Sequence, residues 1–246
     1  MAEPPPAPLR TVTVWQSLRA ELDRRAGTTL HIVDAGGGSG SAAVPLAELG
    51  HEVTVVDASP DALAALQRRA ADSGVADRVR AVQGDTDSLA DIVPDGTVDL
   101  VLCHSVLEYV DDPHRTVGAL AAALRPDGAL SVVVANLHAT LLARLLSGRV
   151  AEAQHVLDDP AGRWGAGDTM LRRYDSTGAT NLLTSAGLRV EKVHGARVLV
   201  DLVPSTLLDA DPVAVQALRH LELAVCDREP YRDLATQLHL LARRPL

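Results

Sequence analysis

VDAGGGSG (residues 33–40) follows a short apolar run at residues 30–34 and precedes a segment predicted to be helical up to residue 49. Glycine lets the backbone turn tightly and approach a ligand without a Cβ clash, and the following helix offers free N–H groups at its N-terminus. Seventeen residues after Gly40, Asp57 ends a second predicted strand, where a carboxylate can accept both hydroxyl groups of a ribose. The turn and the aspartate together predict a nucleoside-binding site.

The glycine spacing separates this turn from the dinucleotide-binding form. A dinucleotide fingerprint has the pattern G-x-G-x-x-G, whereas Ser41 stands at the third glycine position here and the pattern is D-x-G-x-G-x-G from Asp34 to Gly40. At a strand end, Asp34 would place a negative charge near a bound ammonium or sulfonium group, which suits a methionine moiety and repels a pyrophosphate. The spacing therefore favours a nucleoside that carries a cationic group over NAD.

Segments of two kinds alternate along the chain. The predicted strands are residues 30–34, 52–57, 78–83, 98–103, 129–136, 188–195 and 238–243. The predicted helices are residues 9–26, 40–49, 60–72, 113–124, 138–146, 175–186 and 212–226. Ser59 and Pro60 form a good helix start, and residues 126–128 predict a turn. Short apolar runs that alternate with helices indicate a parallel sheet covered on both faces. We expect an α/β protein with a Rossmann-like, doubly wound, seven-stranded, mostly parallel sheet and an antiparallel last strand.

Length and composition fit one large domain. The chain has 246 residues, of which 47% are hydrophobic, so a sizeable core is available even without phenylalanine. Residues 1–8 are rich in proline and predict a flexible leader, and residues 9–246 predict a single domain. The helix and strand pattern weakens at about residues 138–174, which predicts an inserted helical and loop cap.

Charge, cysteines and apolar runs exclude several classes of protein. The net charge of −9 disfavours broad electrostatic capture of nucleic acid or anionic membrane. Apolar runs such as residues 132–135 are far shorter than the roughly 20 residues that span a bilayer, and the start has no apolar signal segment. Cys103 and Cys226 are isolated and form no metal-ligand cluster, as is typical of a reducing compartment. We expect a cytoplasmic protein without a metal site.

Two further segments follow predicted strands at the edge where ligands bind in such sheets. Asp85, Thr86 and Asp87 follow the third strand and could recognise an adenine, with a side-chain acceptor for N6 and a backbone N–H for N1. The alternative for the two aspartates is helix N-capping. Residues 104–109 follow the fourth strand and are expected to close the pocket. His104 is expected to touch the nucleoside, and the alternative for this histidine is a structural hydrogen bonder.

These motifs resemble the class I S-adenosylmethionine-dependent methyltransferases over residues 30–136. The resemblance rests on the glycine turn, Asp57, the Gly84–Thr86 segment and LRPDG (124–128). A closer resemblance, to the bacterial methyltransferases that act on 5-carboxymethoxyuridine in tRNA, extends over nearly the whole chain. It is carried by LRTVTVWQ (9–16), VDAGGGSG (33–40), CHSVLEYVDDP (103–113), ALRPDGALS (123–131), ANLHA (135–139), GARV (195–198), LELAVCDREPY (221–231) and LHLLARRP (238–245).

The resemblance implies S-adenosylmethionine as the cofactor and S-adenosylhomocysteine as its product. It implies cofactor contacts from Arg10, Gly36, Gly37, Asp57, Thr86, Asp87 and His104, to which the glycine turn adds Asp34 and Gly38 and the adenine segment adds Asp85. A guanidinium such as that of Arg10 can hold the methionine carboxylate bidentately. The implied acceptor is itself a carboxylate, so a cationic clamp is expected. The candidates for this clamp are Arg197 first, then Arg172 and Arg173 beside Tyr174, and Asn136.

The methyl acceptor separates three hypotheses. The related enzymes have a longer leader with aromatic residues and a lysine cluster in the middle insertion, whereas Lys192 is the single lysine of this chain. Between residues 142 and 174, five arginines stand against four acidic residues, a small surplus for gripping a tRNA. These departures favour a small-molecule O- or carboxyl-methyltransferase as the alternative to a tRNA enzyme. A non-catalytic nucleoside-binding or NAD-binding domain is the third hypothesis.

Overall fold

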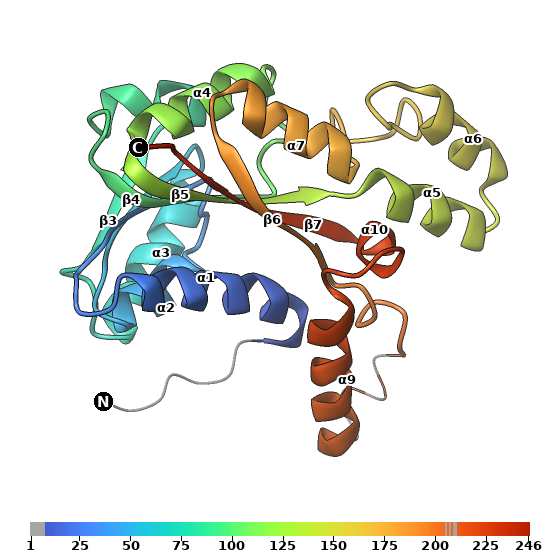
Figure 1. Cartoon of the computed structure of the whole chain (residues 1–246), viewed down its shortest axis with the longest axis horizontal. Coiled ribbons are helices and arrows are strands. Elements are labelled where there is room, and N and C mark those ends of the chain that lie inside the picture. Colours follow the sequence, from blue (N-terminus) through green and yellow to red (C-terminus); the bar gives the residue numbers. More distant parts are fainter. Residues whose placement is uncertain (1–7, 205, 207, 209–210) are drawn as a thin grey trace. The chain divides into compact units, whose positions relative to one another are not determined.

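A seven-stranded sheet forms the centre of the computed structural model, with the strand order β3-β2-β1-β4-β5-β7-β6 (Figure 1). The sheet is mostly parallel and its last strands pair antiparallel, so the predicted Rossmann-like α/β fold is confirmed. The strands are β1 (His31–Ala35), β2 (Glu52–Asp57), β3 (Val79–Gln83), β4 (Val98–His104), β5 (Leu124–Ala135), β6 (Arg189–Ala196) and β7 (Gln237–Arg243). The structure describes residues 8–204, 206, 208 and 211–246, and only the backbone of Asp87. The predicted leader therefore lies outside the described residues except for Pro8.

The chain divides into two compact units. Unit 2 comprises Arg25–Val132, Thr180–Glu191 and Leu241–Leu246, and unit 1 comprises the described parts of Met1–Arg24, Val133–Ala179 and Lys192–Leu240. The single domain with a cap at residues 138–174 stays a prediction. None of the described helices is both long and apolar enough to cross a bilayer.

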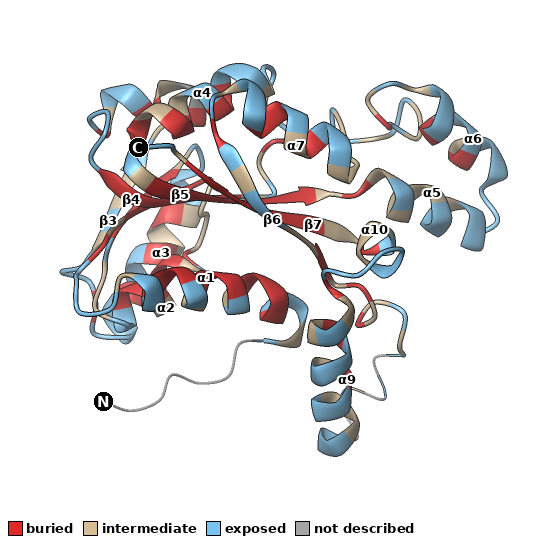
Figure 2. Cartoon of the chain, viewed as in Figure 1, coloured by how far each residue is buried: buried red, intermediate tan, exposed pale blue. Residues whose placement is uncertain are grey.

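The parallel register of unit 2 brings four strand ends to one edge. Ala35 of β1 pairs with Val56 of β2 and with Cys103 of β4, and Asp57 of β2 pairs with Gln83 of β3. The middle strands are buried on both faces, as their red colour in Figure 2 shows, which explains their continuous apolar sequence. The loops that follow β1, β2, β3 and β4 therefore meet at the carboxyl edge of the sheet.

Helices cover both faces of these strands in unit 2. In Figure 1, α2 (Ala43–Glu48) and α3 (Pro60–Asp72) lie on one face and α4 (Pro113–Ala123) lies on the other, while η2 (Thr86–Asp91) is a short 3-10 helix after β3. The predicted start of α3 is confirmed, because the Ser59 hydroxyl accepts the N–H of Ala62 at 3.2 Å. The helix α2 is shorter than predicted, since the glycine turn extends to residue 42.

The predicted turn at residues 126–128 is wrong. These residues belong to β5, because the backbone of Asp127 donates to Arg244 O at 3.0 Å and Gly128 O accepts from Arg244 N at 2.9 Å. Asp127 adopts a left-handed φ of +63°, which accommodates the Pro-Asp-Gly sequence inside the strand. Pairing with a distant segment thus overrides the local turn preference.

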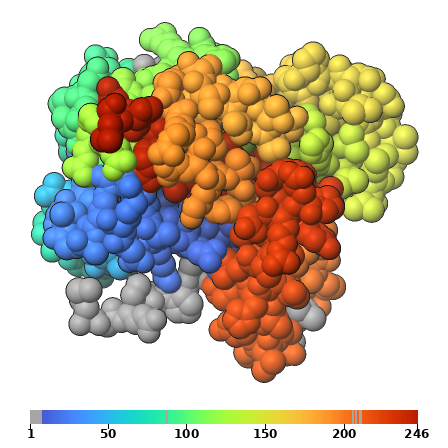
Figure 3. All heavy atoms as spheres, viewed as in Figure 1, coloured from blue at the N-terminus to red at the C-terminus, as the bar shows by residue number. Residues whose placement is uncertain are grey.

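Unit 1 contains a helix that the sequence did not predict. Helix α6 (Val150–Asp158) follows α5 (Leu137–Leu146), and the two pack together as the adjoining yellow-green and yellow spheres of Figure 3 show. Only Ala153 and Val156 of α6 are buried, so its apolar periodicity is too weak to recognise. The remaining helices, of which α7 continues into unit 2, are η1 (Leu9–Thr11), α1 (Val12–Arg24), α7 (Ser176–Ser185), α9 (Pro212–Val225) and α10 (Tyr231–Leu234).

A buried ion pair holds the segment after α6. Both terminal nitrogens of Arg173 bond to the carboxylate of Asp168, with Nη2 at 3.1 Å from Oδ1, and the two side chains are 6% and 2% exposed. Arg173 Nη1 also donates to Gly162 O at 3.1 Å. Arg173 is therefore a structural residue of the predicted cap and not part of a substrate clamp.

We expect Asp168→Ala to lower the free energy of unfolding by about 3–5 kcal/mol, because it leaves a buried guanidinium without its counter-ion. Urea denaturation of the variant measures this loss. Arg163→Ala is the matched control: it breaks the Arg163–Asp159 pair, whose arginine is 51% exposed, and should cost less than about 1 kcal/mol. Equal effects of the two substitutions would contradict this assignment.

Candidate functional site

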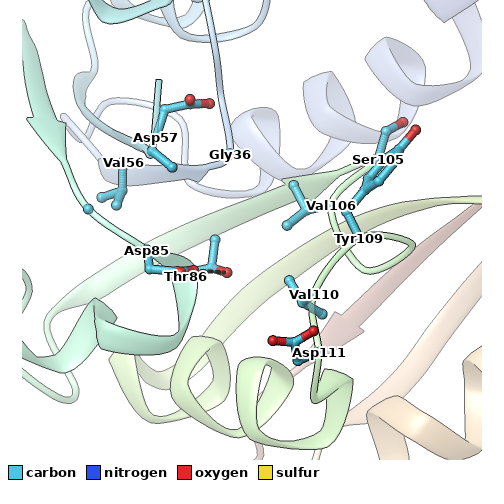
Figure 4. A pocket seen from close by; sticks show the side chains of 12 residues that line it. Gly36, Val56, Asp57, Asp85, Thr86, Ser105, Val106, Tyr109, Val110 and Asp111 are labelled. Carbon is cyan, nitrogen blue, oxygen red and sulfur yellow. Dashed lines mark hydrogen bonds between the residues drawn. The ribbon is translucent and has the colours of Figure 1, made fainter. Parts of the chain in front are cut away.

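A cavity of 370 Å³ lies at the carboxyl edge of unit 2. Its size falls in the range of roughly 300–1,000 Å³ that is usual for small-molecule sites. The loops after β1, β2, β3 and β4 all contribute to it (Figure 4). The lining residues are Gly36, Val56, Asp57, Ala58, Gly84, Asp85, Thr86, Ser105, Val106, Tyr109, Val110 and Asp111.

The glycine turn after β1 is packed too tightly for side chains. Gly36 has a φ of +73°, and a Cβ atom there would lie 2.3 Å from Val106 Cγ2. A Cβ atom on Gly37 would lie 2.4 Å from the carboxylate carbon of Asp34. Gly36 therefore presents bare backbone to the cavity, where a ligand can approach closely, whereas Gly37 and Gly38 are not among the lining residues.

Asp57 joins the glycine turn to the end of β2. Its Oδ2 accepts the N–H of Gly38 at 2.9 Å, and its Oδ1 accepts the N–H of Ser59 at 2.9 Å. An ionised carboxylate has about four lone-pair positions, so two remain for a ligand. Because Asp57 also lines the cavity, this carboxylate can accept the two hydroxyl groups of a ribose.

Asp34 lies behind the turn, against Gly37, and is only 3% exposed. Among the described residues no donor hydrogen-bonds to its carboxylate. Burial, followed by the charge of Asp57, raises the pKa of Asp34 to about 7. A nearby cation would stabilise the ionised form, which fits the expected ammonium group, although Asp34 itself does not line the cavity.

The predicted adenine segment lines the cavity with Asp85 and Thr86, and the Thr86 hydroxyl donates to Asp85 Oδ1 at 3.4 Å. The side chain of Asp87 lies outside the described residues. Ser105, Val106 and Tyr109 line the cavity from the loop after β4 (Figure 4), within the segment at residues 104–109 that we expected to close the pocket. Their position directly after a buried strand was the available signal.

His104 ends β4 and is not among the residues that line the cavity. Its Nε2 lies 2.8 Å from the hydroxyl oxygen of Ser131, and burial lowers the pKa of His104 to about 4. The imidazole is therefore neutral at pH 7 and serves as a structural hydrogen bonder. The neighbouring residues of the same loop form the wall that we expected His104 to form.

The two arginines expected to hold carboxylates belong to unit 1 and share one partner, Asp201. Arg197 follows β6 directly, as predicted, and its Nη2 lies 2.7 Å from Asp201 Oδ2. Arg10 Nη2 lies 3.8 Å from Asp201 Oδ1, and the Arg10 side chain is 62% exposed. Two arginine side chains thus share one carboxylate.

Asn136 and Tyr174 have structural roles in the same unit. Asn136 Nδ2 donates to the backbone oxygens of Asp233 and Ala235, and its Oδ1 accepts the N–H of His138 as the cap of α5. These bonds use both amide hydrogens, so we no longer place Asn136 in the clamp. Tyr174 is buried and pairs with Asn136 through a backbone bridge, while Arg172 is half-buried.

Comparison with known proteins agrees with this site. A family profile described as a methyltransferase domain matches residues 33–132. A solved S-adenosylmethionine-dependent methyltransferase from Mesorhizobium loti has a TM-score of 0.63 at 21% identity, covering 96% of this chain and all of that one. A geranyl diphosphate C-methyltransferase from Streptomyces coelicolor, solved with S-adenosylhomocysteine, has a TM-score of 0.59 at 17% identity and covers 93% and 76% of the two chains. These two likenesses concern the fold.

The fold, the glycine turn and the carboxylates of Asp34 and Asp57 fit a transferase that uses a nucleoside cofactor. The chain belongs to the class I S-adenosylmethionine-dependent methyltransferases. S-adenosylmethionine is its cofactor. Two relatives that match over nearly the whole chain are the tRNA 5-carboxymethoxyuridine methyltransferases of Escherichia coli O157:H7 and K12, each 31% identical over 239 residues, or 96% of this chain and 88% of the relative. A mitochondrial ubiquinone biosynthesis O-methyltransferase of Schizosaccharomyces pombe is 36% identical over 127 residues, or 51% of this chain and 44% of the relative.

The raised pKa of Asp34 predicts pH-dependent cofactor affinity. With a pKa of about 7, the carboxyl group is mostly ionised at pH 8 and mostly protonated at pH 6, where it no longer attracts an ammonium group. We expect the dissociation constant of S-adenosylhomocysteine, measured by calorimetry, to rise about tenfold from pH 8 to pH 6. Asp34→Asn should bind weakly at both pH values. A wild-type affinity that is equal at pH 6 and pH 8 would exclude this role.

Proposed function

We propose that this methyltransferase esterifies the carboxylate of 5-carboxymethoxyuridine in tRNA. The observation that carries the proposal is the likeness to the E. coli enzymes over 96% of the chain. This likeness includes GARV (195–198) and LELAVCDREPY (221–231), two segments outside the cofactor-binding half. A small-molecule enzyme that shared only the cofactor fold would not require them.

The cofactor contacts follow from the cavity. We place the ribose hydroxyls on Asp57, the adenine beside Asp85, Thr86 and Asp87, and the methionine ammonium group near Asp34. The expected contact of Arg10 with the methionine carboxylate stays a prediction. When bound, S-adenosylmethionine supplies a methyl group that its sulfonium already activates, so the protein mainly aligns the acceptor and excludes water.

A carboxylate acceptor removes the need for a general base, because its pKa of roughly 4 keeps it ionised at neutral pH. What the chain must supply is positive charge. Arg197 supplies it, because Asp201 only partly satisfies the guanidinium: the Nε of Arg197 is buried and has no acceptor among the described residues.

A small-molecule hydroxyl acceptor is the second candidate. The net charge of −9 and the single lysine favour it, as does the half-length likeness to an enzyme named for ubiquinone biosynthesis. A neutral hydroxyl must lose its proton during transfer, so this reaction would need a base and would accelerate as the pH rises. The two candidates therefore differ in their pH profile.

Methylation of tRNA that carries 5-carboxymethoxyuridine tests the proposal. With a deuterium-labelled methyl donor, nucleoside mass spectrometry should find a labelled methyl ester, which mild alkali removes. The rate should be flat from pH 6 to pH 9, because the acceptor is ionised throughout. Arg197→Ala should lower the rate by about 10²-fold, the effect of losing a desolvated charge pair of ~3 kcal/mol.

Arg189→Ala is the matched control, since Arg189 lies on β6 and its side chain is 67% exposed. It should leave the rate unchanged. A label that resists alkali, a rate that rises with pH, and a silent Arg197→Ala would together overturn carboxylate methylation in favour of a hydroxyl acceptor.

A further inference from the structure

Two sequence segments that the cofactor fold does not require are joined in space. Gly195 of GARV (195–198) donates its N–H to Cys226 O at 2.6 Å. Val198 of the same segment donates its N–H to Glu222 Oε2 at 3.1 Å. Both acceptors lie in LELAVCDREPY (221–231), at the C-terminal end of α9. The two segments therefore form one structural unit around the loop that follows β6.

Glu222 is the centre of this unit. Its side chain is 1% exposed, and its carboxylate accepts three consecutive backbone N–H groups, from Val198, Leu199 and Val200, the second at 2.7 Å. Consecutive N–H groups make an anion-binding concavity, and bonds to an ionised acceptor are about twice as strong as neutral ones. Because the buried carboxylate accepts all three N–H groups, it holds the loop backbone in one conformation.

The loop held by Glu222 has a charged residue at each end. Arg197 precedes the three N–H groups and Asp201 follows them, and the two side chains meet at 2.7 Å. Arg197 has a left-handed φ of +63°, which a non-glycine residue keeps only when its surroundings impose it. Thr236 adds a second support, because its hydroxyl donates to Asp201 Oδ2 at 2.9 Å.

We propose that Glu222 is a positioning residue for the acceptor. It fixes the loop at residues 197–201, so that Arg197 presents its guanidinium to a carboxylate on the modified uridine, while Asp201 acts as the internal counter-ion that keeps the guanidinium extended. Glu222 does not touch the acceptor, because all of its charge is directed at backbone N–H groups. The identity of the ligand rests on the proposed function, but the mechanical role of Glu222 rests on these contacts.

The test compares two ligands that differ only in the acceptor's charge: an anticodon stem–loop RNA with 5-carboxymethoxyuridine, and the same RNA with its methyl ester. With S-adenosylhomocysteine present, the wild-type protein should bind the acid at least about tenfold more tightly than the ester. Glu222→Gln replaces one acceptor oxygen by an NH₂ group that faces N–H donors. It should reduce this preference to about twofold or less and lower the melting temperature, because a buried N–H loses its acceptor, while the affinity for S-adenosylhomocysteine stays near the wild-type value.

Glu21→Gln is the matched control, because Glu21 is also a buried glutamate of unit 1, on α1, and it should retain the preference. A wild-type protein that binds the acid and the methyl ester equally well would contradict the proposed function. A wild-type preference that Glu222→Gln keeps in full would overturn the positioning role and leave the function standing. Should Glu222→Gln fail to fold, Glu222→Asp, which keeps the charge but shortens the reach, decides in its place: an undiminished preference overturns the proposal and a weakened one supports it.

Discussion

The bond between the Asp57 carboxylate and the Gly38 N–H is the interaction on which the cofactor site depends. It joins the glycine turn after β1 to the end of β2, and the second oxygen of Asp57 fixes the start of the next helix segment through Ser59. The parallel register brings these two strand ends to one edge. One carboxylate therefore shapes the cavity and keeps lone pairs available for a ribose.

In the second half of the chain, a buried carboxylate likewise accepts backbone N–H groups and orders a loop. Glu222 accepts three backbone N–H groups and fixes the loop that carries Arg197, as Asp57 fixes the glycine turn. In both places an acidic side chain orders a segment that contains a left-handed residue, which is Gly38 in the turn and Arg197 in the loop; this conformation is strained only at Arg197. In both places the ordered segment is the one that we expect to meet a ligand.

The sequence predicted the features that depend on local pattern. Apolar runs predicted the strands, and the glycine turn with Asp57 predicted the position of the cavity. This was possible because the carboxyl ends of parallel strands lie at the same edge of the sheet. Features that depend on distant partners were missed: Asp127 of β5 pairs with Arg244, His104 bonds to Ser131, and Asn136 donates to the backbone of Asp233 and Ala235. The role of Glu222 was equally hidden, since its three donors lie more than 20 residues away in sequence.

Calorimetric titration of Asp57→Ala with S-adenosylhomocysteine tests the account at its centre. Removing the carboxylate deprives two ribose hydroxyls of their acceptor and releases the N–H of Gly38, so the affinity should fall by about 30-fold or more, equivalent to ~2 kcal/mol. Asp61→Ala removes an exposed carboxylate on the adjacent helix α3 and should bind like the wild-type protein. An Asp57→Ala variant that is folded and binds S-adenosylhomocysteine with wild-type affinity would contradict the account.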